Sequence, residues 1–151
     1  MDKIEVLKRS DLFRELDDEH LTMVGEIGTQ QVFDAGTVVY GQGSAADLIY
    51  VIDEGLVGII LEVGPLAQRQ VQAAANFESF GWSAMIPPYS RTATVKAIEQ
   101  TKVIPFDGRE LTAFCNTHSE VGFTIMQAVA RAIAERLRQA YIQLLGVTDG
   151  H

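Results

Sequence analysis

The central half of the chain, from about Gln30 to Phe106, consists of short apolar runs separated by glycine-containing turns. The runs are rich in β-branched residues, which favour strands, and Asp34-Ala35-Gly36 and Asp53-Glu54-Gly55 are typical turn sequences. About seven or eight strands are expected, the clearest at 32–33, 37–40, 48–52, 56–63, 68–75, 92–98 and 102–106. Strands at this spacing leave no room for crossover helices, so the pattern predicts a mainly β sandwich or barrel.

Helical patterns flank the strand-rich region. Residues 9–25 place apolar side chains on one helical face, which predicts a short N-terminal helical segment. Residues 108–116 predict a short helix, and Ser119 is expected to cap a long helix that ends near residue 145. An apolar seam follows this long helix: Phe123, Met126, Ala130, Ile133, Leu137, Ala140 and Leu144. The seam predicts a homodimer, although Ile125 and Val129 beside it also allow the helix to fold back onto the β region.

Charge and hydropathy exclude several kinds of partner. The chain has 151 residues, enough for one domain, and a formal net charge of -8. Between Arg14 and Arg69 it has no lysine or arginine but many acidic residues, a charge distribution that repels nucleic acid. No segment approaches the roughly twenty apolar residues that span a bilayer, and the first residues do not resemble a secretory signal. We therefore expect a cytoplasmic protein without nucleic-acid or membrane partners.

The residues that enzymes use most often are sparse. His20, His118 and His151 lie outside the predicted strands, whereas a metal-dependent barrel enzyme needs several histidines and a carboxylate converging on the metal. The single Cys115 lies in an apolar helical context and is expected to pack in the core. No nucleophile and base pair is evident. We expect no catalytic residue, no metal site and no cofactor, and we predict that the chain is not an enzyme.

One segment has the chemistry of an anion site. Gly81 lets the backbone bend, and the residues after it can form a helical turn whose free N–H groups point at an anion. Arg91 adds a planar, permanently charged fork that suits two phosphate oxygens. The residues alone leave two alternatives open, an exposed loop arginine or an arginine paired with an internal carboxylate.

The order of these parts resembles the cyclic nucleotide-binding domain family, which includes catabolite activator protein and the regulatory subunits of protein kinase A. The resemblance rests on the segment Tyr50 to Val57, on Phe80-Gly81, on the run Arg91 to Ala97 and on the long final helix, and it covers about residues 7–145. It implies a jelly-roll-like β-roll, or double-stranded β-helix, with an N-terminal helix and a long C-terminal helix. The implied single domain, 1–151, divides into helical segment 1–28, β-roll 29–107, C-terminal helices 108–145 and tail 146–151.

The resemblance also implies a ligand, cAMP or cGMP, whose cyclic phosphate rests on a cassette at residues 80–92. Arg91 matches the arginine that pairs with the phosphate, the backbone N–H groups of Ser83 and Ala84 match those that face it, and Thr92 matches a small residue that contacts the ligand in some relatives. Tight-binding relatives carry a glutamate after Phe-Gly that accepts the proton of the ribose 2′-hydroxyl, but this chain has Trp82. The cassette is therefore degenerate, and the implied ligand-binding residues are Phe80, Gly81, Trp82, Ser83, Ala84, Arg91 and Thr92.

Three outcomes remain open for this site. Loss of a hydrogen bond to a charged group predicts binding of a cyclic nucleotide weaker by about ten- to a hundredfold, unless Ser83 or Glu78 replaces the contact. The site could instead hold another phosphate or anion, or the domain could be a scaffold for dimerisation or protein interaction without a ligand. In a sensor, an anion at Arg91 would draw the cassette inward and repack the long helix. Many members of that family append a DNA-binding module after this helix, and from the short tail we expect none here unless the chain is a fragment of a longer protein.

Overall fold

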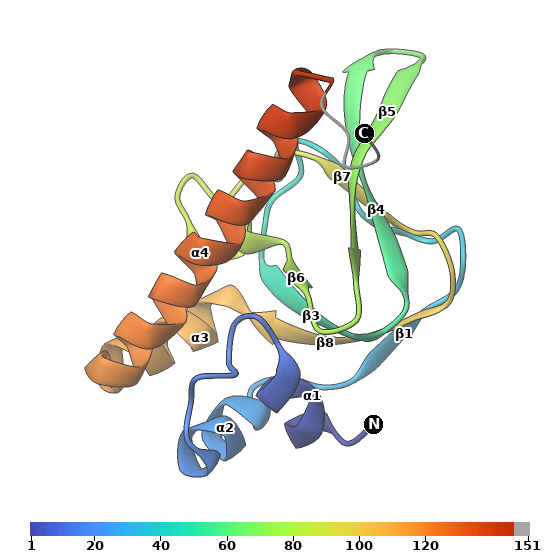
Figure 1. Ribbon diagram of the computed structural model, residues 1–151. Helices are drawn as coiled ribbons and strands as arrows, with labels where there is room; N and C mark the ends of the chain where they lie inside the picture. Colours follow the sequence, from blue (N-terminus) through green and yellow to red (C-terminus); the bar gives the residue numbers. More distant parts are fainter. Residues whose placement is uncertain (147–151) are drawn as a thin grey trace.

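The computed structural model describes residues 1–146, in which the strands form two four-stranded sheets (Figure 1). All strand pairs among these residues are antiparallel. The first sheet has the order β1 (Gln31–Phe33), β8 (Thr101–Asp107), β3 (Leu48–Glu54) and β6 (Ser79–Phe80). The second has the order β2 (Val38–Tyr40), β7 (Thr94–Ala97), β4 (Leu56–Gly64) and β5 (Ala67–Ala75). The predicted mainly β fold with flanking helices is confirmed.

Strand β3 shows how the core divides. Successive side chains of a strand point to opposite faces. Ile49 and Val51 belong to a buried cluster shared with the helices, whereas Tyr50 and Ile52 belong to a second cluster between the two sheets. Because both faces are covered, residues 49–53 are all buried, which explains why this segment reads as a continuous apolar run in the sequence.

The N-terminal segment differs from the prediction. It consists of two helices, α1 (Lys3–Arg9) and α2 (Asp18–Gly25), and residues 11–15 between them form turns. The hydroxyl of Ser10 donates to the Leu7 carbonyl at 2.8 Å and accepts from the Phe13 amide at 3.1 Å, which ends α1. Asp17 then caps α2 by accepting from the His20 amide at 2.9 Å. The single helical face predicted over 9–25 is wrong because these side-chain hydrogen bonds compete with a continuous helix.

The C-terminal part matches the prediction more closely. Helix α3 (Gly108–Thr117) contains Cys115, which is buried in the core as predicted, and α4 (Ser119–Leu144) is the long helix. Ser119 is not a cap, because His118 occupies the N-cap position and its side chain makes no capping hydrogen bond. Neither α4 nor any other helix within residues 1–146 is long and apolar enough to cross a bilayer.

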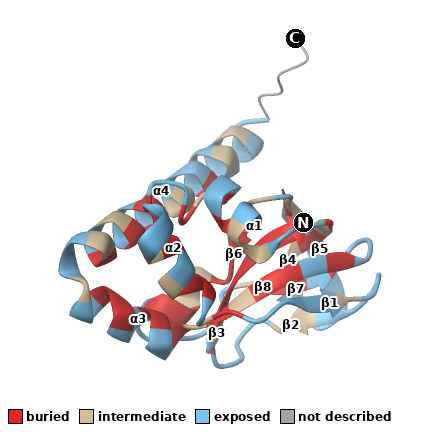
Figure 2. Ribbon diagram, turned by 90° about the horizontal axis from the view of Figure 1, so that it is seen from below, coloured by how far each residue is buried: buried red, intermediate tan, exposed pale blue. Residues whose placement is uncertain are grey.

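Helix α4 separates its apolar residues onto two faces. Ile125, Ala128 and Val129 are buried against the rest of the domain. Most of the predicted seam points outward, since Phe123 is 68 % exposed and Leu137 is 49 % exposed (Figure 2). The C-terminal half of α4 lies beside β5, with a cavity of about 790 Å³ between them.

Candidate anion-binding site

The cassette begins with a sharp change of backbone direction. After β6, Gly81 adopts a left-handed conformation with φ of 83°, and Trp82–Met85 form one turn of 3₁₀ helix. A Cβ atom at Gly81 would lie 3.0 Å from Nη1 of Arg91 and 3.1 Å from the Leu48 carbonyl oxygen. Glycine is therefore required both for the backbone angle and for the close approach of the arginine.

Arg91 is held beside this turn without an acidic partner. Its side chain is buried, with the residue only 4 % exposed. Nη1 donates to the Gly81 carbonyl at 3.0 Å and Nη2 donates to the Leu48 carbonyl at 2.7 Å. Its guanidinium carbon lies 3.8 Å from the centroid of the Tyr40 ring. These contacts exclude an exposed arginine, and no carboxylate among residues 1–146 forms an ion pair with it.

One polar atom of Arg91 remains unsatisfied. Its Nε is buried and has no hydrogen-bond partner in the structure. The two carbonyls supply only partial negative charge, so the buried guanidinium retains a full positive charge that nothing in contact with it neutralises. An anion that reaches this side chain would compensate the charge.

A cavity of about 140 Å³ opens beside Arg91. It brings together six of the seven predicted ligand-binding residues with four others; the lining is Tyr40, Ile59, Gln72, Phe80, Gly81, Trp82, Ser83, Arg91, Thr92 and Ala93. None of these residues carries a carboxylate. The seventh predicted residue, Ala84, lies outside the lining, and its N–H donates to the Gly81 carbonyl at 3.2 Å within the turn. Its own carbonyl oxygen abuts α3, since a Cβ at Gly108 would lie 2.3 Å from that oxygen.

Sequence reasoning missed Tyr40, Ile59, Gln72 and Ala93. Tyr40 is the most consequential, because its ring supports Arg91 and lies 6.2 Å from the Phe80 ring. Burial raises the pKa of Tyr40 to about 12, so the phenol stays neutral. The sequence gives no sign that Tyr40 contacts Arg91. Tyr40 lies on β2 and Arg91 lies in the loop before β7, and only the folded sheet brings the two together.

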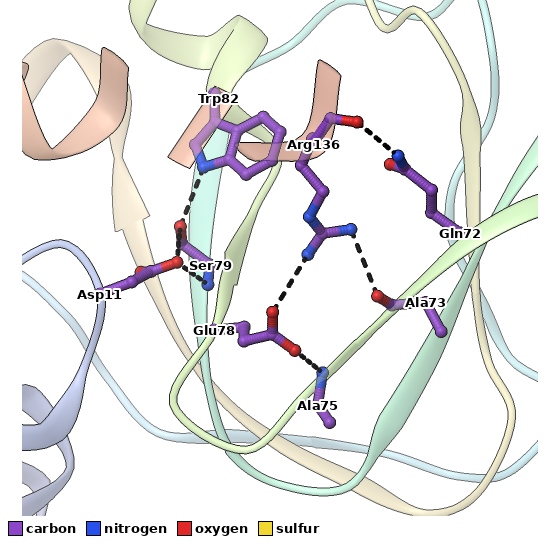
Figure 3. Close-up of polar contacts among 8 residues, drawn as sticks. All are labelled: Asp11, Gln72, Ala73, Ala75, Glu78, Ser79, Trp82 and Arg136. Carbon is purple, nitrogen blue, oxygen red and sulfur yellow. Dashed lines mark hydrogen bonds and ion pairs between the residues drawn. The ribbon is translucent and has the colours of Figure 1, made fainter. Parts of the chain in front are cut away.

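Trp82 joins the cassette to the N-terminal segment (Figure 3). Its indole Nε1 donates to Oγ of Ser79 at 2.9 Å, and Ser79 donates through both its backbone N and its Oγ to Oδ2 of Asp11 at 3.0 Å. Burial raises the pKa of the Asp11 carboxyl, although the hydrogen bonds from Ser79 oppose that shift. The guanidinium of Arg136, from α4, lies 5.4 Å from the centre of the indole on its other side.

Arg136 in turn attaches α4 to the strands. Its Nη1 donates to the Ala73 carbonyl at 3.3 Å, and its backbone carbonyl accepts from Nε2 of Gln72 at 2.8 Å. Its Nη2 lies 3.9 Å from Oε2 of Glu78, whose Oε1 accepts from the Ala75 amide at 2.9 Å. Burial lowers the pKa of Arg136, and the nearby carboxylates of Glu78 and Asp11 oppose that effect. Of the two substitutes suggested for the missing glutamate, Ser83 lines the cavity and Glu78 does not.

Neither His20 nor His118 belongs to a metal site within residues 1–146. The rings of His20 and His118 meet edge to face at 6.0 Å, and His118 also contacts Phe114. Within the described residues, no group of three or more His, Cys, Asp or Glu side chains could hold a metal ion. His151 lies outside those residues, as does the tail from residue 147 onward.

The comparisons with known proteins agree on one family. Residues 30–118 match the family described as cyclic nucleotide-binding domain. A structure of the N-terminal domain of a transcriptional regulator from Streptomyces coelicolor is 27 % identical, with a TM-score of 0.73, over 97 % of this chain and 99 % of that one. A cyclic nucleotide-binding domain from Methylobacillus flagellatus has a TM-score of 0.83 at 17 % identity, over 98 % of this chain and 83 % of that one, which shows the shared fold.

Curated relatives are longer proteins. One from Rhodopseudomonas palustris, named as a potassium channel protein, is 27 % identical over 95 % of this chain, and the match spans 34 % of that protein. A lysophospholipase from Aspergillus terreus is 30 % identical over 70 % of this chain, and that match spans 7 % of its length. The chain thus corresponds to about a third or less of these relatives.

Proposed function

Because the chain belongs to the cyclic nucleotide-binding domain family, we propose that it is a regulatory sensor that binds cAMP, cGMP or a related phosphate ester at Arg91 and signals through α4. The observation that carries this proposal is the state of Arg91, which is buried, unpaired with any acid among residues 1–146 and left with an unsatisfied Nε. A buried charge of this kind is costly unless an anion compensates it, and the planar guanidinium matches the geometry of a phosphate.

Different residues around Arg91 would contact different parts of the ligand. Arg91 would pair with the phosphate, and Ser83 and Thr92, which line the cavity, would donate to its oxygens through the Ser83 amide and the Thr92 hydroxyl. The aromatic side chains of Tyr40, Phe80 and Trp82 supply apolar surface for the body of the ligand.

Binding of a nucleotide would require the cavity to enlarge, and this requirement would link binding to α4. At about 140 Å³ it is smaller than the roughly 300–1,000 Å³ of typical ligand sites. Gln72 lines both this cavity and the larger one beside α4, and its hydrogen bond to the Arg136 carbonyl lies between them. A nucleotide would enter fully only if that contact opened. The ligand would then favour a different position of α4. The size of that shift is limited by how much more tightly the ligand binds the domain with α4 displaced than with α4 in place.

Two observations favour a second function. The tryptophan at the usual glutamate position and the small cavity together suit a β-roll that has lost its ligand and acts as a scaffold. Both functions are compatible with a homodimer, which we propose forms through the exposed seam of α4 from Phe123 to Leu144. The absence of enzyme activity and the cytoplasmic location stay predictions from the sequence.

Titration of the intact protein with cAMP and with cGMP tests the proposal. We expect saturable heat in calorimetry and a change in the fluorescence of Trp82, the sole tryptophan. Arg91→Ala should abolish both responses while circular dichroism shows a folded protein, and Arg109→Ala, at an exposed arginine, should leave them unchanged. A wild-type protein that gives no response to either nucleotide would favour the scaffold.

A further inference from the structure

We infer that Tyr40 is a positioning residue of the anion site: its ring, in place of a carboxylate, holds the guanidinium of Arg91 in the orientation that receives an anion. Tyr40 would act through the arginine that pairs with the phosphate, so this role rests on the proposed function. It adds to that function a residue on another strand that would set the affinity of the site.

Three groups contact the guanidinium of Arg91. The carbonyls of Gly81 and Leu48 accept from Nη1 and Nη2 at 3.0 and 2.7 Å. The Tyr40 ring lies against the same group, with its centroid 3.8 Å from Cζ. Two of the three partners are therefore main-chain atoms, and Tyr40 supplies the contact that a substitution can remove while both hydrogen bonds stay available.

A ring and a carboxylate stabilise a buried guanidinium in different ways. A carboxylate would neutralise Arg91 and would compete with an incoming anion for its N–H donors. The face of an aromatic ring attracts a cation but brings no negative charge. Burial raises the pKa of Tyr40 to about 12, so the phenol stays neutral at physiological pH. The charge of Arg91 and its unpartnered Nε thus remain available to a ligand.

Contacts with both sheets hold the Tyr40 ring in place. Tyr40 is the last residue of β2 and pairs with Val95 of β7, in the second sheet. Its ring lies 6.3 Å from that of Tyr50 on β3 and 6.2 Å from that of Phe80 on β6, both in the first sheet. The latter two rings stack on each other at 4.8 Å. Arg91 lies in a loop, so the ring connects a loop side chain to strands of both sheets.

The size of the effect on affinity follows from the strength of the contact with the ring. Without the Tyr40 ring, Arg91 would occupy the binding orientation for a smaller fraction of the time, and the apparent dissociation constant would rise by the inverse of that fraction. The attraction between a cation and an aromatic ring corresponds to a factor of about two to thirty. We therefore expect Tyr40→Leu to weaken anion binding by about two- to thirtyfold and Tyr40→Phe to stay within about twofold of the wild type.

Nuclear magnetic resonance of the intact protein without ligand tests the orientation itself. A proton over the face of a ring is shifted upfield, so Hε of Arg91 should resonate upfield of Hε of the exposed Arg109. Tyr40→Leu should remove this difference and Tyr40→Phe should keep it. Phe33→Leu is the matched control and should also keep it, because Phe33 packs in the same aromatic cluster, 6.2 Å from the Tyr50 ring, without lining the cavity. A wild-type Arg91 signal that coincides with that of Arg109 would overturn the inference.

Calorimetry with cyclic AMP measures the consequence for binding. Support requires that Tyr40→Leu lose about two- to thirtyfold in affinity while Tyr40→Phe and Phe33→Leu bind as the wild type does. Equal affinity of Tyr40→Leu and the wild type would refute the role of Tyr40, and so would an equal loss in Phe33→Leu, which would indicate only a loosened core. If the wild type does not bind cyclic AMP, the proposed function fails, and the Arg91 signal alone decides whether Tyr40 positions the guanidinium. Should Tyr40→Leu fail to fold by circular dichroism, the wild-type signal decides.

Discussion

Arg91→Ala should destabilise the domain even when no ligand is present. The substitution removes two hydrogen bonds to main-chain carbonyls, at 2.7 and 3.0 Å, and the stacking on Tyr40 at 3.8 Å. It leaves the Gly81 and Leu48 carbonyls without those donors, in a part of the protein where the arginine itself is only 4 % exposed. Arg91 therefore ties the cassette to β3 before any anion arrives.

The size of the effect follows from opposing contributions. Each hydrogen bond from a charged donor contributes about 1.5–3 kcal/mol, and a cation over an aromatic ring contributes about 0.5–2 kcal/mol. Alanine also relieves the cost of burying a guanidinium, which is several kcal/mol and offsets a large part of that loss. We expect a net loss of about 2–3 kcal/mol in the free energy of unfolding, which lowers the Tm by roughly 4–12 °C for a chain of this size.

Urea unfolding of the two proteins without ligand, followed by circular dichroism, measures this difference. Arg109→Ala removes an exposed arginine and should stay within about 0.5 kcal/mol of the wild type. If Arg91→Ala is as stable as the wild type, the hydrogen bonds to the two carbonyls make no net contribution to the free energy of unfolding. Our conclusion that Arg91 holds the cassette to β3 would then be wrong.

Three further predictions concern other parts of the domain. Gly81→Ala and Gly36→Ala both place a side chain at positive φ, but of these two positions only Gly81 has neighbours close to the new Cβ, at 3.0 and 3.1 Å. Urea unfolding should therefore show a free energy of unfolding about 1 kcal/mol lower for Gly81→Ala than for Gly36→Ala, and equal losses would refute the steric reason. The raised pKa of Asp11 means that its contribution to stability is full below the ordinary value of 3.8 and falls as pH rises through the folded-state pKa. Asp11→Asn should therefore gain stability relative to the wild type as pH rises from about 3.5 to 7, and a difference independent of pH would contradict this. Leu137→Glu, at a half-exposed seam position, should convert the dimer to a monomer in sedimentation without unfolding it, whereas a wild-type monomer at tens of micromolar would remove the dimer proposal.

The fold was largely predictable from local patterns. The β-branched runs between about Gln30 and Phe106 correspond to every strand of the two sheets except the short β6, because each run carried its own propensity and its own turn residues. The break between α1 and α2 was not predicted, since the apolar spacing of Leu12, Phe13 and Leu16 fits a helix equally well. The competing hydrogen bonds of Ser10 decided the outcome, and residue spacing does not reveal them.

The candidate site was predictable only where its residues lie close together in the sequence. Gly81, Ser83 and Arg91 belong to one short segment, so their chemistry could be read together. Tyr40 contributes through a contact that depends on how the sheets close. Arg136 was not singled out in the sequence, and its guanidinium is held by two acceptors, the Ala73 carbonyl and the Glu78 carboxylate, and lies over the Trp82 ring. Such partners are defined by tertiary structure alone.

The contact between Ala84 and Gly108 limits how the response of this domain can be tuned. The backbone of the 3₁₀ turn rests directly on the first residue of α3, with no side chain between them that could be made longer or shorter. A side chain added at Gly108 would therefore push the two elements apart. The link from the turn to α4, by contrast, passes through the side chains of Trp82 and Arg136. Point substitution can therefore strengthen, weaken or remove the connection to α4, whereas the contact between Ala84 and Gly108 offers no side chain that could be shortened.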